Sequence, residues 1–209
     1  MRTILFLHGW GASPDSFVAI RKYFDNEYCT IAPALPTPPD EVWTLNDYVD
    51  YVQMILQRNN ITKCDIVAHS FGARVAVLLA KRGMVGKMVI TGGAGLRPRF
   101  NLWVWLKIKI YKIFKLGKGS TDYKKLNANG KATFNNIIRR DLATEISTLD
   151  VPTLLITGER DRATPPYMAK RWARVAGNAR YKIYKGCGHF AYLDNPTRFI
   201  KDAREFLHE

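Results

Sequence analysis

Short apolar runs alternate along this chain with segments of helical periodicity, and this alternation constrains the fold more than any other feature. The expected strands are Arg2 to Leu7, Tyr28 to Ala32, Cys64 to His69, Lys87 to Thr91, Thr153 to Thr157 and Arg180 to Tyr184. The expected helices are Leu45 to about Asn59, Phe71 to Arg82, Pro166 to Val175, and Pro196 to Leu207 with Asn195 as its cap. Strands and helices that alternate in this way form a parallel sheet with helices on both faces. We therefore predict an α/β fold with a mostly parallel sheet of about six strands.

One interruption stands out in this alternation. After Gly95 no strand is expected until Thr153, and most of the intervening sequence is strongly basic. The 209 residues, 47% of them hydrophobic, are of a size and composition that suit one compact domain. We predict a single domain over residues 1–209 that carries a helical cap insertion at about 97–143.

Composition limits the classes of protein that this chain can belong to. No apolar run reaches the roughly 20 residues that a membrane-spanning helix needs, because four lysines interrupt the longest candidate, Leu102 to Leu116. The N-terminal apolar run is also shorter than that of a secretory signal peptide. Three widely spaced cysteines show no metal-binding or disulfide pattern. We expect free thiols in a cytoplasmic protein that can associate peripherally with a membrane.

The strongest chemical signal is the strand from Cys64 to His69, which runs directly into Ser70 and then into a helix. A serine on such a sharp strand-to-helix turn needs small residues two positions away on either side, and Ala68 and Gly72 occupy those positions. The helix N-terminus beside Ser70 can stabilise a developing oxyanion. The pattern predicts a nucleophile elbow; a helix-capping serine after a buried strand is the alternative.

Two glycine-rich turns follow other strands. In the first, His8-Gly9-Trp10-Gly11, we assign the main-chain N–H groups of Trp10 and Phe71 to an oxyanion hole, and we expect His8 to order the loop through hydrogen bonds. In the second, the loop after the last strand carries His189, the predicted general base.

A carboxylate is needed to orient that base. The strand from Thr153 ends in a turn that carries Asp161, which we predict to be the orienting acid. Glu159 is the nearby competitor, but it leaves the strand too early and is expected to be solvated or paired with arginine. Cys187 is expected to be a small semi-buried residue and not a nucleophile.

The chain order Ser70, Asp161, His189 is that of the α/β-hydrolase triad. On these motifs the chain resembles the α/β-hydrolase superfamily throughout its length. Within the superfamily it is similar to small esterases and lipid- or carrier-ester hydrolases with a His-Gly-x-Gly loop and a Gly-x-Ser-x-Gly elbow. It departs from them at Ala68, in lacking antiparallel strands before the first motif, and in its basic insertion.

The resemblance implies that Ser70 attacks an ester or thioester carbonyl with help from His189, and that water then hydrolyses the acyl-enzyme. It implies no metal and no organic cofactor. A C–C bond hydrolase with the same triad stays open. So does a catalytically idle scaffold that binds a ligand or a partner.

The insertion suggests what the substrate looks like. A helix from Leu102 to Leu116 places Trp103, Leu106 and Ile110 on one apolar face, although its alternation also permits a short strand. We expect these three residues to contact a small ester substrate that bears an acyl chain.

The net charge of +14 suggests further partners. Twelve Lys and Arg residues, against Asp122 alone, lie between Arg97 and Arg140. An anionic membrane surface or an acidic carrier protein is therefore a possible partner. Nucleic acid is not expected, because no recognition motif is present.

Overall fold

The computed structural model describes residues 1–38, 40–97 and 126–209, and its centre is one six-stranded sheet. The strands are β1 (Arg2–Leu7), β2 (Tyr28–Ile31), β3 (Cys64–His69), β4 (Val85–Thr91), β5 (Thr153–Gly158) and β6 (Ala179–Tyr184). Their order is β2-β1-β3-β4-β5-β6, and every neighbouring pair is parallel. This confirms the predicted α/β class and the number of strands.

The strand order reverses next to β1. The chain passes from β1 to β2 on one side and then returns to place β3 on the other side of β1. In open parallel sheets the loops diverge at such a switch point and leave a crevice at the carboxyl ends of the strands. The loop after β1 and the turn after β3, which carry Trp10 and Ser70, both start at this crevice.

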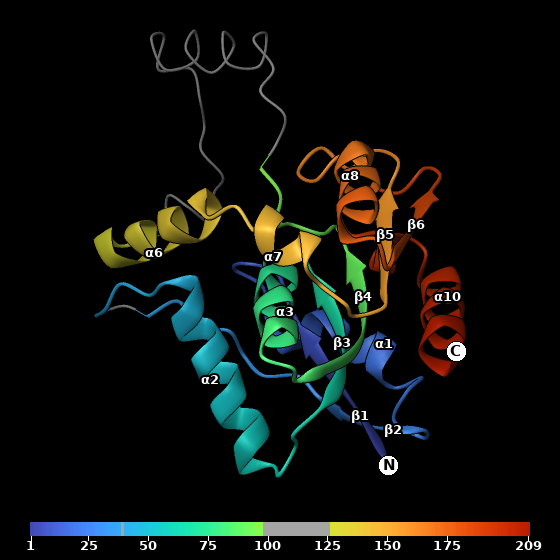
Figure 1. Cartoon of the computed structure of the whole chain (residues 1–209), viewed down its shortest axis with the longest axis horizontal. Helices are drawn as coiled ribbons and strands as arrows, with labels where there is room; N and C mark the ends of the chain where they lie inside the picture. The colour runs from blue at the N-terminus through green and yellow to red at the C-terminus, as the bar shows by residue number, and fades with distance from the viewer. Residues whose placement is uncertain (39, 98–125) are drawn as a thin grey trace, which may run out of the picture.

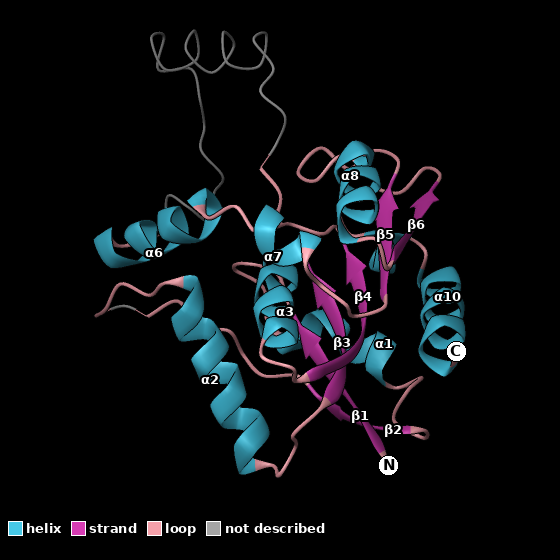
Figure 2. Ribbon diagram, in the orientation of Figure 1, coloured by secondary structure: helices cyan, strands magenta, loops and turns pink. Residues whose placement is uncertain are grey.

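Helices cover both faces of the sheet (Figure 2). They are η1 (Pro14–Phe17), α1 (Val18–Arg21), α2 (Leu45–Arg58), α3 (Phe71–Lys81), α6 (Ala128–Arg139), α7 (Ala143–Ser147), α8 (Pro166–Ala176), α9 (Ala191–Asp194) and α10 (Pro196–His208). Successive strand residues point to opposite faces, so each strand serves two cores. In β1, Leu5 packs with α2 and α3, whereas Phe6 packs with α1 and α10.

The predicted elements differ from the observed ones mainly at their ends. Strand β4 begins at Val85, two residues before the expected start, and β2 ends at Ile31. Helix α10 begins after Asn195, whose side chain accepts a hydrogen bond from the Arg198 N–H, as predicted. The short segments η1, α1 and α9 were not predicted, because four residues are too few to show a helical period.

The predicted insertion at about 97–143 is described only in part. Helix α6 lies at the N-terminal end of α2, near the carboxyl edge of the sheet (Figure 1). The proposed substrate contacts Trp103, Leu106 and Ile110 lie outside the described residues. Within the described ranges, no helix combines the length and the apolar character that crossing a membrane would require.

Candidate active site

Ser70 lies on a strained turn between β3 and α3. Its backbone angles are φ 48° and ψ −107°, and among the described non-glycine residues only Asn60 and Ser70 have a positive φ. Such a conformation costs on the order of 1–3 kcal/mol and persists only where the surrounding structure enforces it. The Ser70 N–H donates to the Thr91 carbonyl at 3.1 Å, which ties the turn to the end of β4.

The elbow depends on a close approach between α3 and β1. A Cβ atom on Gly72 would lie 2.2 Å from the Leu7 carbonyl oxygen, so no larger residue fits there. On the other side of Ser70, Ala68 is fully buried in β3, with its methyl group in the core. The requirement for small residues around the elbow is therefore strict at Gly72, while an alanine is accommodated at position 68.

Asp161 follows β5 and is held by three donors from its own turn. Its Oδ1 accepts hydrogen bonds from the N–H groups of Ala163 (2.8 Å) and Thr164 (2.9 Å), and its Oδ2 accepts one from the Thr164 hydroxyl at 2.8 Å. Burial raises the pKa of this carboxyl, but the hydrogen bonds from His189 and Thr164 outweigh burial and leave the pKa below its usual range. Asp161 is therefore an anion at neutral pH, although its side chain is inaccessible to solvent.

His189, in the loop after β6, lies with its Nδ1 atom 2.9 Å from Asp161 Oδ2. An ionised carboxylate can only accept, so Nδ1 carries the proton and donates. In the neutral imidazole the lone pair is then on Nε2. The ring is partly accessible, with 21% of the side chain exposed, as an acid–base group that serves a substrate requires.

Several contacts place the His189 ring beside the Ser70 turn. A Cβ atom on Gly92 would lie 3.0 Å from the Cε1 and Nδ1 atoms of His189. Gly92 directly follows Thr91, whose carbonyl accepts the Ser70 N–H. On the other side, the His69 and His189 ring centroids are 4.7 Å apart. The structure thus brings the predicted acid and base into contact and packs the base against the neighbours of Ser70.

The loop after β1 packs on this turn. A Cβ atom on Gly9 would lie 3.7 Å from the Ser70 Cβ, so the loop backbone lies close to the serine. His8 orders the loop as predicted: its Nε2 accepts from the Leu35 N–H at 2.9 Å, which makes Nδ1 the donor to the Gly9 carbonyl at 2.8 Å. Burial lowers the pKa of His8, in keeping with this neutral form.

The two main-chain N–H groups assigned to the oxyanion hole lie at the start of α3 and in the turn after β1. Phe71 is the first residue of α3, where N–H groups have no intrahelical partner. The hydrogen bond from Ala12 N to the Gly9 carbonyl closes the turn around Trp10 at 3.2 Å without using the Trp10 N–H.

Four aromatic side chains pack together beside the loop after β1. The Trp10 ring makes edge contacts with Phe71, at 5.5 Å between centroids, and with Tyr48, at 6.4 Å. Phe134 of α6 packs on Trp10 at 5.3 Å. These four residues form what we call the aromatic wall, in which Tyr48 and Phe71 are buried and Trp10 and Phe134 are partly accessible. An apolar wall of this kind suits the hydrocarbon part of a ligand.

Two other candidate groups, Glu159 and Cys187, take no part in the Asp161–His189 contact. Glu159 is exposed to solvent, as expected, and it also accepts a hydrogen bond from the Gly186 N–H at 3.0 Å. The Cys187 thiol is buried, and burial raises its pKa, which is the opposite of what a thiolate nucleophile needs. In the described parts of the chain, no three His, Cys, Asp or Glu side chains are grouped so that they could bind a metal ion.

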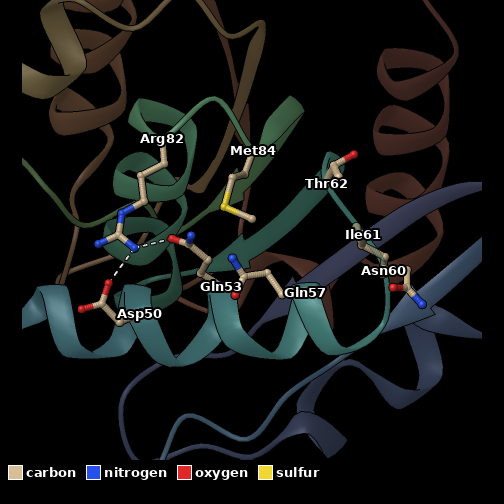
Figure 3. A pocket seen from close by; sticks show the side chains of 8 residues that line it. All are labelled: Asp50, Gln53, Gln57, Asn60, Ile61, Thr62, Arg82 and Met84. Carbon is tan, nitrogen blue, oxygen red and sulfur yellow. Dashed lines mark hydrogen bonds and ion pairs between the residues drawn. The ribbon is translucent and has the colours of Figure 1, made fainter.

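A groove of about 1130 Å³ lies at the other end of the sheet (Figure 3). Thr62 and Met84, which line it, precede β3 and β4, so the groove opens at the amino ends of the strands. Its arginine, Arg82, points to Asp50, with which it forms an ion pair, and to Gln53 (Figure 3). Because ligands of parallel sheets bind at the carboxyl ends, this groove is not the candidate active site.

Comparison with known proteins identifies the family. Residues 4–203 match the model of the alpha/beta hydrolase family, so the chain belongs to that family. It is 22% identical over 204 residues to 2-hydroxymuconate semialdehyde hydrolase of Pseudomonas putida, with 82% of this chain and 72% of that protein covered. The enol-lactonase of Burkholderia xenovorans has a similar fold, with a TM-score of 0.80, 18% identity, and 100% of this chain and 92% of that chain covered.

Other relatives match over a shorter segment. The proline iminopeptidase of Lactobacillus helveticus is 29% identical over 63 residues, which is 30% of this chain and 21% of that protein. This chain therefore spans about a fifth of the length of the first curated relatives that it matches.

Two neighbours of the predicted triad were missed from the sequence. Thr164 donates to Asp161, and His69 packs on His189. The Asp-x-x-Thr spacing was a usable signal for the first, because an aspartate often accepts hydrogen bonds from residues two and three positions later. No pattern in the sequence predicts the contact of His69 with His189, because β3 and the loop after β6 meet only in the folded protein.

Proposed function

We propose that this protein is a serine hydrolase that cleaves a carboxylic ester or thioester through an acyl-enzyme on Ser70. In this mechanism the Nε2 lone pair of His189 accepts the Ser70 hydroxyl proton as Oγ attacks the carbonyl carbon. The imidazolium then donates that proton to the leaving alcohol or thiol. Water, activated by the same nitrogen, attacks the acyl-enzyme and releases the acid and free Ser70.

The single observation that carries this proposal is the Asp161–His189 hydrogen bond beside the strained Ser70 turn. A buried carboxylate that accepts from Nδ1 fixes the tautomer in which Nε2 is basic, and it stabilises the imidazolium that forms on proton transfer. Neither role requires the carboxylate to take up the proton.

Negative charge develops on the carbonyl oxygen during attack. We propose that the main-chain N–H groups of Trp10 and Phe71 bind this oxygen, supported by the dipole of α3, whose N-terminus is at Ser70. The loss of one such donor typically lowers kcat by about 10²–10³-fold, so the proposed hole would supply a substantial part of the rate.

The acyl group of the substrate is proposed to lie along the partly accessible members of the aromatic wall, Trp10 and Phe134. Trp10 is both a proposed oxyanion donor, through its main chain, and a member of this wall, through its ring. The name of the structural neighbour from Burkholderia xenovorans, an enol-lactonase, supports an ester-type substrate. The Pseudomonas putida relative, a semialdehyde hydrolase, favours C–C bond hydrolysis with the same residues as the second candidate.

The proposal is tested with a fluorophosphonate probe and with nitrophenyl esters of increasing acyl length. We expect the probe to label the wild-type protein and not Ser70→Ala. The same substitution should lower kcat/KM by a factor on the order of 10⁴ or more, because the nucleophile is lost. Ser147→Ala on α7 is the matched control, since the Ser147 hydroxyl donates to the Thr144 carbonyl in its own helix.

Each outcome separates the candidates. Labelling that survives in Ser70→Ala would assign the nucleophile to another residue. No labelling and no ester turnover by the wild-type protein would support the idle scaffold. Labelling without turnover of any ester, together with cleavage of a vinylogous 1,5-diketone, would favour the C–C bond hydrolase.

A further inference from the structure

Thr164 is a buried residue at the candidate site with no part in the mechanism above. It lies in the turn after β5 and is 7% exposed. Its hydroxyl donates to Asp161 Oδ2 at 2.8 Å, and its N–H donates to Asp161 Oδ1 at 2.9 Å. One residue therefore contacts both oxygens of the proposed orienting carboxylate.

The two side-chain donors meet at one atom. Asp161 Oδ2 accepts from the Thr164 hydroxyl and, at 2.9 Å, from His189 Nδ1. The two donor atoms lie 3.4 Å from each other, so Thr164 Oγ1 also touches the imidazole. Its single proton is committed to the carboxylate, because an ionised carboxylate can only accept.

The terminal torsion of an aspartate is broad, so packing alone positions its oxygens poorly. The main-chain donors of Ala163 and Thr164 hold Oδ1, whereas the Thr164 hydroxyl is the donor from this turn that reaches Oδ2. The hydroxyl thereby sets the angle at which Oδ2 faces the imidazole.

We propose that Thr164 is a positioning residue, whose hydroxyl holds the Asp161 carboxylate in the orientation that presents Oδ2 to His189. The role in catalysis rests on the proposed function of Ser70 and His189. The hold on the carboxylate can be measured without turnover.

The Thr164 hydroxyl also stabilises the negative charge of the Asp161 carboxylate. Burial raises the pKa of Asp161, and the hydrogen bonds from His189 and Thr164 lower it. The other titratable groups near the pair are His69 at the end of β3, in ring contact with His189, and His8, which acts on His69. Burial keeps both neutral. When the hydroxyl is removed, Asp161 has less compensation for its charge, and protonation of His189 becomes more favourable.

The test compares Thr164→Val, which keeps the shape and removes the hydroxyl, with Thr164→Ser, which keeps the hydroxyl. Thr157→Val is the matched control, because the buried Thr157 hydroxyl donates to the Thr164 carbonyl and not to a carboxylate. The His189 imidazole is titrated by ¹⁵N NMR, and the pH profile of kcat/KM for a nitrophenyl ester is recorded in parallel.

In Thr164→Val we expect the midpoint of the His189 titration and the acid limb of the pH profile to move together to higher pH. We expect kcat to fall about tenfold, with KM within about twofold, because Thr164 is buried and acts through Asp161. Thr164→Ser and Thr157→Val should titrate like the wild-type protein. If Thr164→Val does not fold, Thr164→Ala takes its place in the test, because it also removes the hydroxyl.

A His189 pKa that is unchanged in Thr164→Val would overturn the proposal, and so would an equal shift in Thr164→Ser. Failure of the proposed function has a different signature. In that case the wild-type protein is neither labelled by the fluorophosphonate nor active on any ester, while the NMR titration still decides whether the hydroxyl acts on the Asp161–His189 pair.

Discussion

At the scale of single residues, burial decides the charge of His69. The ring is 2% exposed, and its Nδ1 donates to the Thr91 carbonyl at 3.1 Å. Burial, together with the neighbouring His189, lowers the pKa of His69 from 6.5 to about 3. Next to the proposed nucleophile, Ser70, a neutral imidazole adds bulk and a hydrogen bond without a competing charge.

This lowered pKa makes stability depend on pH. The unfolded chain binds a proton at His69 below about pH 6.5, whereas the folded protein does not until about pH 3. The unfolded state therefore binds more protons between these values, and stability falls as pH falls through this window. From about pH 6.5 to about pH 5 the loss from this one residue is roughly 2 kcal/mol.

We predict that His69→Asn removes this loss, because asparagine can donate to the Thr91 carbonyl but does not titrate. Urea unfolding at the two pH values should show a drop in stability that is smaller in His69→Asn than in the wild-type protein by that amount. The pKa of His8 is also lowered by burial, but His8 is present in both proteins, so its contribution cancels when the two drops in stability are compared. Equal drops would show that His69 is accessible to protons in the folded state.

At the scale of elements, α6 is the part of the predicted insertion whose docking is described. Thr133 of α6 is fully buried, and its hydroxyl accepts a hydrogen bond from the Trp43 N–H at 2.9 Å. One residue further along, Phe134 packs on Trp10. The helix thus connects the loop before α2 with the loop of the proposed oxyanion hole.

Thr133→Val should loosen this contact, because the Trp43 N–H then loses its partner at a partly buried position, at a cost of about 1–3 kcal/mol. We expect faster amide exchange in α6 and at Trp43, with little change in α10, whose contacts are elsewhere. Thr133→Ser keeps the hydroxyl and should exchange like the wild-type protein. Unchanged exchange in Thr133→Val would mean that the ring of Phe134 holds the helix on its own.

At the scale of the whole molecule, the basic residues of the chain serve more than one purpose. Arg97 donates to the Arg139 carbonyl at 2.8 Å, and Arg171 donates to the Arg97 carbonyl at 2.7 Å. The buried Arg74 donates to the Arg140 carbonyl at 2.7 Å. Part of the net charge of +14 thus joins the two ends of the predicted insertion to α3 and α8.

The rest of that charge is proposed to attract an anionic surface. We predict that vesicles containing phosphatidylglycerol change the rate on long-chain nitrophenyl esters, and that vesicles of phosphatidylcholine alone do not. High salt should abolish the difference, because it screens the attraction between exposed charges. Short-chain esters, which stay in water, are the control. Equal rates under all these conditions would contradict a role for the membrane surface.

Much of the fold was predictable because its signals are local. The strand from Cys64 to His69 was predicted with its observed bounds, since a continuous apolar run that ends in a sharp turn has few other structures available. The start of β4 was predicted late because Gly86 interrupts its apolar pattern, although β4 pairs with β3 from Val85 onward. Pairing with a neighbouring strand, and not propensity, sets that boundary.

The sequence by itself determined the α/β class, the strand count and the residue types at the ends of the strands, because each depends on local periodicity or on one turn. Only the tertiary structure decided that His189 meets Asp161, that Thr164 and His69 contact this pair, and that Phe134 reaches Trp10. These contacts join residues from different strands and helices. Their distances depend on how the sheet twists and how the helices pack, and no short stretch of sequence encodes that.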